Sequence, residues 1–200
     1  MGEQHTGKAE AGMEVSKREE REQRILDAAA ELLERWGYRK VTIDDIAKQA
    51  GVAKGTIYLH WKTREDLFVA LIAREKFRLL ADVQQRMAVD PDGWTMVGLV
   101  KHSTLATLQQ PLMKALFLRD VDALGELVPR VEDSELYQSQ VQGYMHLLEF
   151  LRQHGVLRDD IDLRTQVFTL ISVAWGFILV EPVLPEMFKF PDEETVEIMA

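Results

Sequence analysis

The residues from Ile43 to Lys62 restrict the fold of this chain more than any other segment, because small and apolar side chains recur there at fixed spacing. Ala47 falls where two short helices would cross most closely, and a larger side chain would push them apart. Gly51 falls at the turn between them, where the backbone needs a left-handed conformation that glycine adopts without strain. Ile57 then lies where it can pack back onto Ile46 and Ala47. The pattern predicts a helix-turn-helix, a motif whose second helix enters a major groove of DNA.

Helical spacing extends over the rest of the chain, and no segment shows the alternation expected of a strand. Capping boxes at Ser16-x-x-Glu19 and Thr63-x-x-Asp66 predict helices over residues 16–36 and 63–87. Asp90 followed by proline predicts the start of a further helix that ends near residue 109. Residues 1–15 are polar and aperiodic, so we expect them to form a disordered tail. The sequence therefore predicts an all-α fold.

Charge is distributed unevenly along the chain. The whole sequence has a formal net charge of -9, yet residues 35–64 contain seven basic and two acidic side chains. A local basic face can therefore attract a polyanion although the molecule is acidic overall. Cysteine is absent, and the N-terminal residues lack the apolar segment of a signal peptide. We expect a cytoplasmic protein that does not associate with membranes.

The second helix of the motif would present donors and cations outward. These outward side chains are Lys54, Thr56, Tyr58 and His60, with Lys62 just beyond the helix. Lysine, hydroxyl and imidazole groups suit contacts to phosphates and to base edges. Gly55 leaves the first turn without a side chain, so the backbone could approach DNA closely. Thr42 and its neighbours would offer free N–H groups to a phosphate at the N-terminus of the preceding helix.

Residues 18 to 70, which include IAKQAGVAKGTIYLHWKTREDLF, resemble the DNA-binding domain of the TetR family of transcriptional regulators. The resemblance implies phosphate contacts for Thr42, Tyr58, His60 and Lys62, and base-facing positions for Lys54, Gly55 and Thr56. It further implies that Leu59 touches a thymine methyl group or a sugar, and that Trp61 locks the recognition helix onto the following helix. Residues 16–62 would form the three-helix DNA-binding domain.

The resemblance also implies that residues 63–200 form a helical domain for ligand binding and dimerisation, so that a homodimer reads a double-stranded operator. Apolar, aromatic and polar-tipped side chains are the candidates for the pocket of a small-molecule effector: Trp94, His102, Leu105, Phe117, Tyr137, Tyr144, Met145, Phe168 and Trp175. Helix 163–180 supplies the candidates for the dimer interface: Val167, Leu170, Ile171, Ala174 and Ile178.

Motifs of catalysis and of cofactor binding are absent from the sequence. There is no glycine-rich phosphate loop, no G-x-S-x-G and no H-E-x-x-H, so we predict neither an enzyme nor a metal site nor a cofactor.

The function indicated is a ligand-responsive regulator, a repressor released from a palindromic operator by an apolar or amphipathic molecule. An activator, a regulator without a ligand, and a helical ligand-binding protein without a DNA-binding role stay open as alternatives.

Overall fold

The structure is a computed structural model that describes residues 3–118, 120, 124–155, 157–180, 183–191, 194 and 198. Side-chain environments are described for the same residues, with a few exceptions. The exceptions are 3–15, 96, 117, 136, 137, 140, 143, 144, 147, 170, 171, 173–175, 177 and 178.

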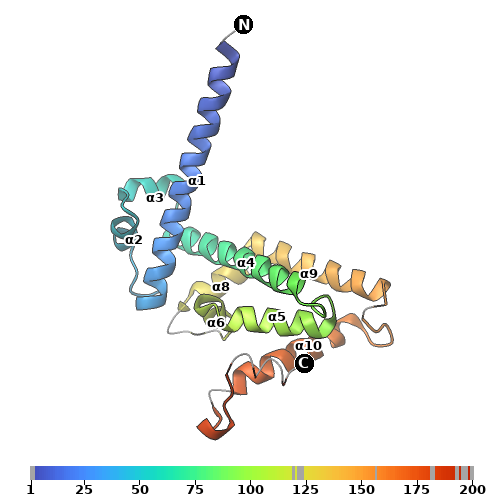
Figure 1. Cartoon of the computed structure of the whole chain (residues 1–200). Helices are drawn as coiled ribbons and strands as arrows, with labels where there is room; N and C mark the ends of the chain where they lie inside the picture. The colour runs from blue at the N-terminus through green and yellow to red at the C-terminus, as the bar shows by residue number, and fades with distance from the viewer. Residues whose placement is uncertain are drawn as a thin grey trace. The chain divides into compact units, whose positions relative to one another are not determined.

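Every regular element among the described residues is a helix, which confirms the all-α prediction (Figure 1). The helices are α1 (Glu3–Trp36), α2 (Ile43–Ala50), α3 (Lys54–His60), α4 (Arg64–Val89), α5 (Met96–Leu108), α6 (Pro111–Phe117), α8 (Leu127–Glu132), α9 (Glu135–Gln153) and α10 (Leu163–Val180), with a short 3-10 turn at Glu186–Phe188. Helix α1 begins at Glu3, so residues 3–15, which were expected to be disordered, continue its helical path. Glutamate, lysine and alanine in this stretch favour helix whereas its two glycines do not, and the expectation of a disordered tail stays a prediction.

The chain divides into two compact units. Unit 1 consists of Met1–Ile72 and Asp120–Arg130, and unit 2 consists of Ala73–Arg119 and Val131–Ala200. Helix α4 passes from the first unit into the second along the chain. The functional division into residues 16–62 and 63–200 stays a prediction.

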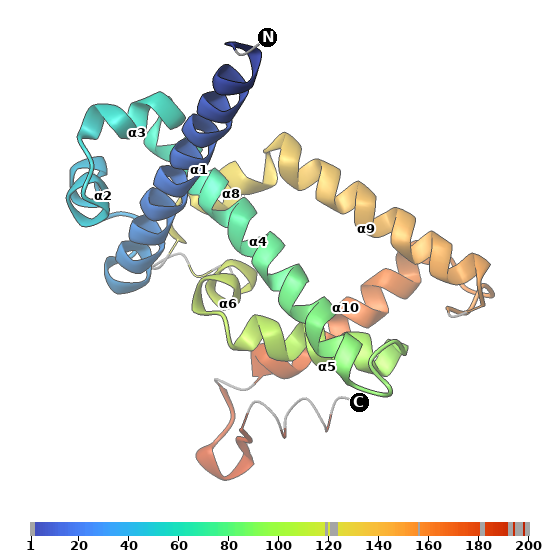
Figure 2. The same ribbon diagram turned by 45° about the horizontal axis from the view of Figure 1, so that its top comes forward.

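The core of unit 1 is built from the inward faces of its helices. Helix α1 places Ile25, Leu32 and their apolar neighbours inward at helical spacing, each at most 5% exposed. The fully buried side chains of the following helices include Ile46, Ile57 and Phe68. Burial of each such side chain contributes roughly 1.5–3 kcal/mol to folding. Helices α2 and α3 are short and pack against this core, which fixes their position beside α1 (Figures 1 and 2).

Arg64 ties the first turn of α4 to the loop that precedes α2. Its Nε donates a hydrogen bond to the carbonyl oxygen of Val41 at 2.9 Å, and its Nη2 donates to the carbonyl oxygen of Tyr38. The guanidinium lies 3.9 Å from the ring centroid of Tyr38, which contacts Phe68 edge-on. These contacts hold the entry to the helix-turn-helix against α4, and they join residues more than 20 positions apart that no local pattern connects.

Residues 120–130 belong to unit 1 although they follow unit 2 residues in the chain. Leu124 and Leu127 are fully buried, and Val128 is 8% exposed. Gly125 has a positive φ of 53°, and a Cβ atom at this position would lie 3.4 Å from Cδ1 of Tyr38. This segment therefore contributes buried side chains to unit 1, and the prediction that residues 63–200 as a whole serve ligand binding and dimerisation stays a prediction.

Unit 2 contains a small core between α4 and α5, in which Val83, Met87 and Ala106 are buried. The predicted helix start at residue 91 is wrong, because α5 begins at Met96 with the Thr95 hydroxyl capping the N–H of Gly98. Asp90 accepts hydrogen bonds from the N–H of Asp92 and from the ring of His102 instead of capping a helix.

Candidate nucleic-acid interface

The turn between α2 and α3 has the geometry that the sequence predicts. Gly51 follows α2 with φ 66° and ψ 37°, and its N–H points to the carbonyl oxygens of Ala47 and Lys48. The N–H of Val52 donates to the carbonyl oxygen of Ala47 at 3.0 Å. Ala47 and Ile57 are buried at the crossing of the two helices. The steric assignment of the helix-turn-helix is therefore confirmed.

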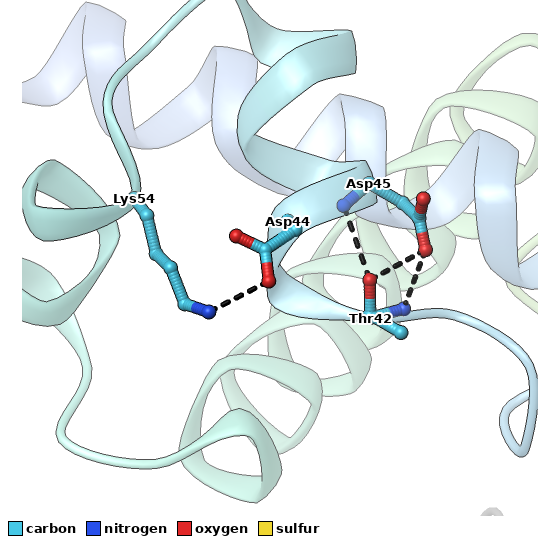
Figure 3. Close-up of polar contacts among 4 residues, drawn as sticks. All are labelled: Thr42, Asp44, Asp45 and Lys54. Atoms are coloured by element: carbon cyan, nitrogen blue, oxygen red, sulfur yellow. Dashed lines mark hydrogen bonds and ion pairs between the residues drawn. The ribbon is translucent and has the colours of Figure 1, made fainter.

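Thr42 caps α2 through a capping box with Asp45 (Figure 3). The N–H of Asp45 donates to Thr42 Oγ1 at 3.2 Å, while the Thr42 hydroxyl and N–H donate to Asp45 Oδ2 at 2.5 Å and 3.1 Å. The two hydrogen bonds that the Asp45 carboxylate accepts, first from the Thr42 hydroxyl and second from the Thr42 N–H, hold the pKa of Asp45 below its ordinary value. Thr42 is exposed, but its hydroxyl already has a partner within the protein. Its contact with a phosphate stays a prediction.

Helix α3 presents one exposed face. Lys54 and Gly55 are exposed in its first turn, and Tyr58 and Leu59, four residues later, are 46% and 77% exposed. Positions four apart lie one above the other on a helix, so these four residues share one surface. A Cβ atom at Gly55 would meet nothing within 4 Å, so its bare backbone is open to an approaching partner. An exposed leucine and tyrosine beside a lysine form a surface suited to the methyl groups, sugars and phosphates of a DNA groove.

Lys54 is held by an acidic side chain of α2. Its Nζ lies 2.6 Å from Oδ2 of Asp44 (Figure 3). This hydrogen bond raises the pKa of Lys54 above its ordinary value, so the side chain keeps its positive charge.

His60 and Thr56 differ from the outward orientation expected of them. The His60 side chain is 4% exposed, its Nδ1 lies 3.5 Å from Oε2 of Glu22 on α1, and its ring packs against Trp61. Thr56 is half-buried. Both lie on the side of α3 that carries the buried Ile57, because a short helix packed on α1 has only one free face. Contacts of His60 and Thr56 with DNA stay predictions that require this packing to open.

Lys62 and Trp61 complete the segment. Lys62 is exposed just beyond α3, which leaves it accessible to a phosphate. Trp61 follows the last helical residue, and its N–H donates to the carbonyl oxygen of Ile57 at 3.0 Å. Trp61 is half-buried, and its role in locking the recognition helix onto α4 stays a prediction.

The candidate pocket and dimer residues lie in unit 2, and the structure describes only some of their side chains. His102 is buried with its Nε2 2.8 Å from Oδ2 of Asp90, and Leu105 is half-buried. Trp94, Met145 and Phe168 are 70%, 36% and 71% exposed. Val167 on α10 is half-buried. The side chains of Phe117, Tyr137, Tyr144, Trp175, Leu170, Ile171, Ala174 and Ile178 lie outside the described residues, so the pocket and dimer assignments stay predictions.

Two kinds of feature are absent from the described part of the chain. Within it, no helix is long and apolar enough to cross a membrane. Nor do the described histidine, aspartate and glutamate side chains gather in a group of three or more that could hold a metal ion.

Comparison with known proteins identifies the helix-turn-helix region. Residues 25–71 match the family of bacterial regulatory proteins named after TetR. The fatty acid metabolism regulator protein of Bacillus subtilis is 27% identical over 146 residues, which cover 70% of this chain and 72% of that protein. The HTH-type transcriptional repressor BepR of Brucella suis is 26% identical over 168 residues, 80% of this chain and 79% of the relative.

The fold is shared with a solved structure over almost the whole chain. The transcriptional regulator FadR from Bacillus subtilis, solved in complex with stearoyl-CoA, superimposes with a TM-score of 0.56 and 19% sequence identity, covering 88% of this chain and 96% of FadR. The matched motif and its geometry agree, and the helix-turn-helix region of this chain, residues 25–71, is that of the TetR family of bacterial regulatory proteins.

Proposed function

We propose that this protein is a transcriptional repressor that binds a palindromic operator as a homodimer and is released from it by an amphipathic small molecule. The observation that carries the DNA-binding part is the exposed face of α3, where Lys54, Gly55, Tyr58 and Leu59 lie together on a helix whose opposite side is locked into the core. A single helix of this size contacts only a few base pairs, so two copies related by symmetry are needed for a specific site.

The class of effector is proposed from two features. Most of the candidate pocket residues, Leu105 among them, are apolar or aromatic in type, and an apolar lining with few polar groups suits an amphipathic molecule. The relative FadR was solved with stearoyl-CoA, a molecule with a long acyl chain and a polar head. A long-chain acyl-CoA is therefore the first compound to test.

The mechanism proposed for release is a difference in ligand affinity between two forms of the dimer. In one form the recognition helices are wrongly spaced for successive major grooves, and a ligand that binds this form better lowers the affinity for the operator. The operator lowers the affinity for the ligand by the same factor, because the coupling between two sites is reciprocal. Helix α4 connects the two parts along the chain, since it follows α3 directly and continues into unit 2. Catalysis plays no part in this function, and we place the protein in the cytoplasm, where the DNA is.

The experiment is a comparison of two DNA duplexes over a range of salt concentrations. One duplex is selected from a random pool by the wild-type protein, and the other is a scrambled duplex of equal length and composition. We expect tighter binding to the selected duplex and a steep fall of log K with log salt, because phosphate contacts release counterions. Equal, weak binding to both duplexes would refute the operator proposal.

Two lysine variants separate phosphate contacts from base contacts. Lys62→Ala should weaken binding to both duplexes alike and reduce the salt slope by about 0.9, the value for one phosphate. Lys54→Ala should weaken binding to the selected duplex by about 5- to 150-fold and lower the preference for it. Lys114→Ala, which changes a lysine of α6 in unit 2, is the matched control and should bind as the wild type does.

The ligand is tested on the same selected duplex. Palmitoyl-CoA should lower the affinity of the protein for the selected duplex while leaving binding to the scrambled duplex almost unchanged. Decanol, an alkyl chain with a hydroxyl group, should show whether a chain with a small polar head is enough. If the acyl-CoA binds the protein without any effect on operator affinity, the release mechanism is wrong.

A further inference from the structure

An ion pair connects the two helices of the helix-turn-helix on its exposed side. Asp44 is the second residue of α2 and Lys54 is the first residue of α3, and their charged atoms lie 2.6 Å apart (Figure 3). The side chains are 68% and 49% exposed, so water and an approaching partner reach both of them. An exposed pair of this kind adds little to folding stability.

Asp44 is not needed to cap α2. The capping box is complete with Thr42 and Asp45, whose carboxylate accepts both the hydroxyl and the N–H of Thr42. Asp44 thus stands as a second acidic side chain in a segment where basic residues dominate, and its described polar contact is with Lys54. Its carboxylate in the first turn of α2 favours the helix dipole, and its ion pair in addition brings it to the predicted base-reading lysine.

The pair affects operator DNA and other DNA differently. A lysine ammonium has three donors, so Lys54 can keep its hydrogen bond to Asp44 and also donate to the O6 and N7 acceptors of a guanine. Non-operator DNA presents no matching base edge to Lys54, so the ammonium would contact a phosphate instead, and such a phosphate would stand close to the Asp44 carboxylate. The phosphate and the carboxylate also repel each other. The pair therefore opposes binding that depends on phosphates alone.

We propose that Asp44 is a positioning residue that restrains Lys54 and thereby weakens binding to non-operator DNA more than binding to the operator. The inference rests on the proposed function, because it assumes that α3 reads an operator. It assigns to an acidic side chain of the first helix a part in the sequence preference of the second.

The test is Asp44→Asn, measured on the selected and the scrambled duplex. Release of Lys54 should allow one additional phosphate contact, so the affinity for the scrambled duplex should rise about 5- to 10-fold at low salt and its salt slope should steepen by about 0.9. Affinity for the selected duplex should change by less than about twofold, since Lys54 already has its base contact there. The preference for the selected duplex should fall about fivefold.

Three further variants separate the proposed role from a change of charge. Asp44→Glu keeps the carboxylate and should retain the wild-type preference. Glu20→Gln removes one exposed negative charge from α1 and should leave the ratio of the two affinities unchanged. In a Lys54→Ala background, Asp44→Asn should no longer affect the ratio. Circular dichroism checks that each variant keeps its helical content.

The outcomes distinguish this inference from the proposed function. Equal gains on both duplexes, an unchanged ratio, or an effect of Asp44→Asn that persists without Lys54 each overturn the role of Asp44. If the wild type shows no preference for any selected duplex, the proposed function fails. The effect of Asp44→Asn on the salt slope for scrambled DNA is then still measurable, and it decides whether Asp44 restrains Lys54.

Discussion

Gly51 and Gly55 form a matched pair in which one substitution should destabilise the protein and the other should stabilise it. A Cβ atom would meet nothing within 4 Å at either position, so steric clashes contribute to neither substitution. The difference lies in the backbone, because Gly51 has a φ of 66° whereas Gly55 lies within α3. Comparing Gly51→Ala with Gly55→Ala therefore isolates backbone conformation from packing.

The expected magnitudes follow from this difference. An L-residue in the left-handed region costs about 1–2 kcal/mol. The lower entropy of the unfolded alanine chain offsets roughly 0.4–1 kcal/mol of that cost. Gly51→Ala should thus lower the free energy of unfolding by about 0.5–1 kcal/mol. Gly55→Ala should raise it by about 0.5–1 kcal/mol, the helix-propensity difference between the two residues.

The assay combines unfolding with DNA binding. Urea unfolding at one fixed protein concentration gives the change in stability, since a dimer makes apparent stability depend on concentration. Binding to the selected duplex should be weakened by Gly55→Ala although this variant is the more stable, because the added methyl group stands on the open face of α3. Gly51→Ala should keep its affinity at temperatures where it is folded. A Gly55→Ala protein that is more stable and binds as tightly as the wild type would refute the reasoning that the backbone of α3 approaches DNA at Gly55.

Three other changes test the contacts that position the motif. Thr42→Val keeps the shape of the side chain but removes the capping hydroxyl, and it should cost about 1 kcal/mol in urea unfolding; an unchanged midpoint would show that the cap is dispensable. Arg64→Lys retains the charge but loses the paired hydrogen bonds, one of them to Val41, and the stacking on aromatic rings, so we expect a loss of about 1–2 kcal/mol, measured in the same way. The pKa of Asp90 lies below its ordinary value, first because its carboxylate accepts the backbone N–H of Asp92 and second because it accepts a hydrogen bond from His102. The ionised carboxylate therefore stabilises the fold above the unfolded pKa, and this contribution is lost as the pH falls through the folded pKa. Asp90→Asn should therefore flatten the decline of stability below about pH 4, and an acid-unfolding curve as steep as that of the wild type would contradict this.

The helix-turn-helix was predictable from the sequence because its constraints are local and steric. Ala47, Gly51 and Ile57 lie within eleven consecutive residues. The first position requires a small side chain, the second a left-handed backbone and the third an apolar side chain, and few residue types meet each requirement. The burial of Ala47 and Ile57 and the positive φ of Gly51 follow from those requirements.

Other features depend on contacts between segments that the sequence alone does not connect. The inward orientation of His60 depends on how α3 packs against Glu22 of α1, and alternate positions along a helix do not share one face. Both Asp90 and Thr95 are residue types that can cap a helix, and α5 begins at Met96 with Thr95 as its cap. The Asp90 carboxylate is instead hydrogen-bonded to His102. Neither contact has a signature in local spacing.

The return of residues 120–130 to unit 1 has a consequence for the order in which a newly made chain can fold. Emergence of Ile72 from the ribosome does not complete unit 1, because Leu124 and Leu127, both fully buried in it, have not yet been synthesised. Residues 73–119 must be translated first, and at about 5–20 residues per second this adds a delay of several seconds. During that interval the nascent helix-turn-helix exposes part of its apolar interior. We therefore expect the capacity to bind DNA to appear only after much of the other unit has been synthesised.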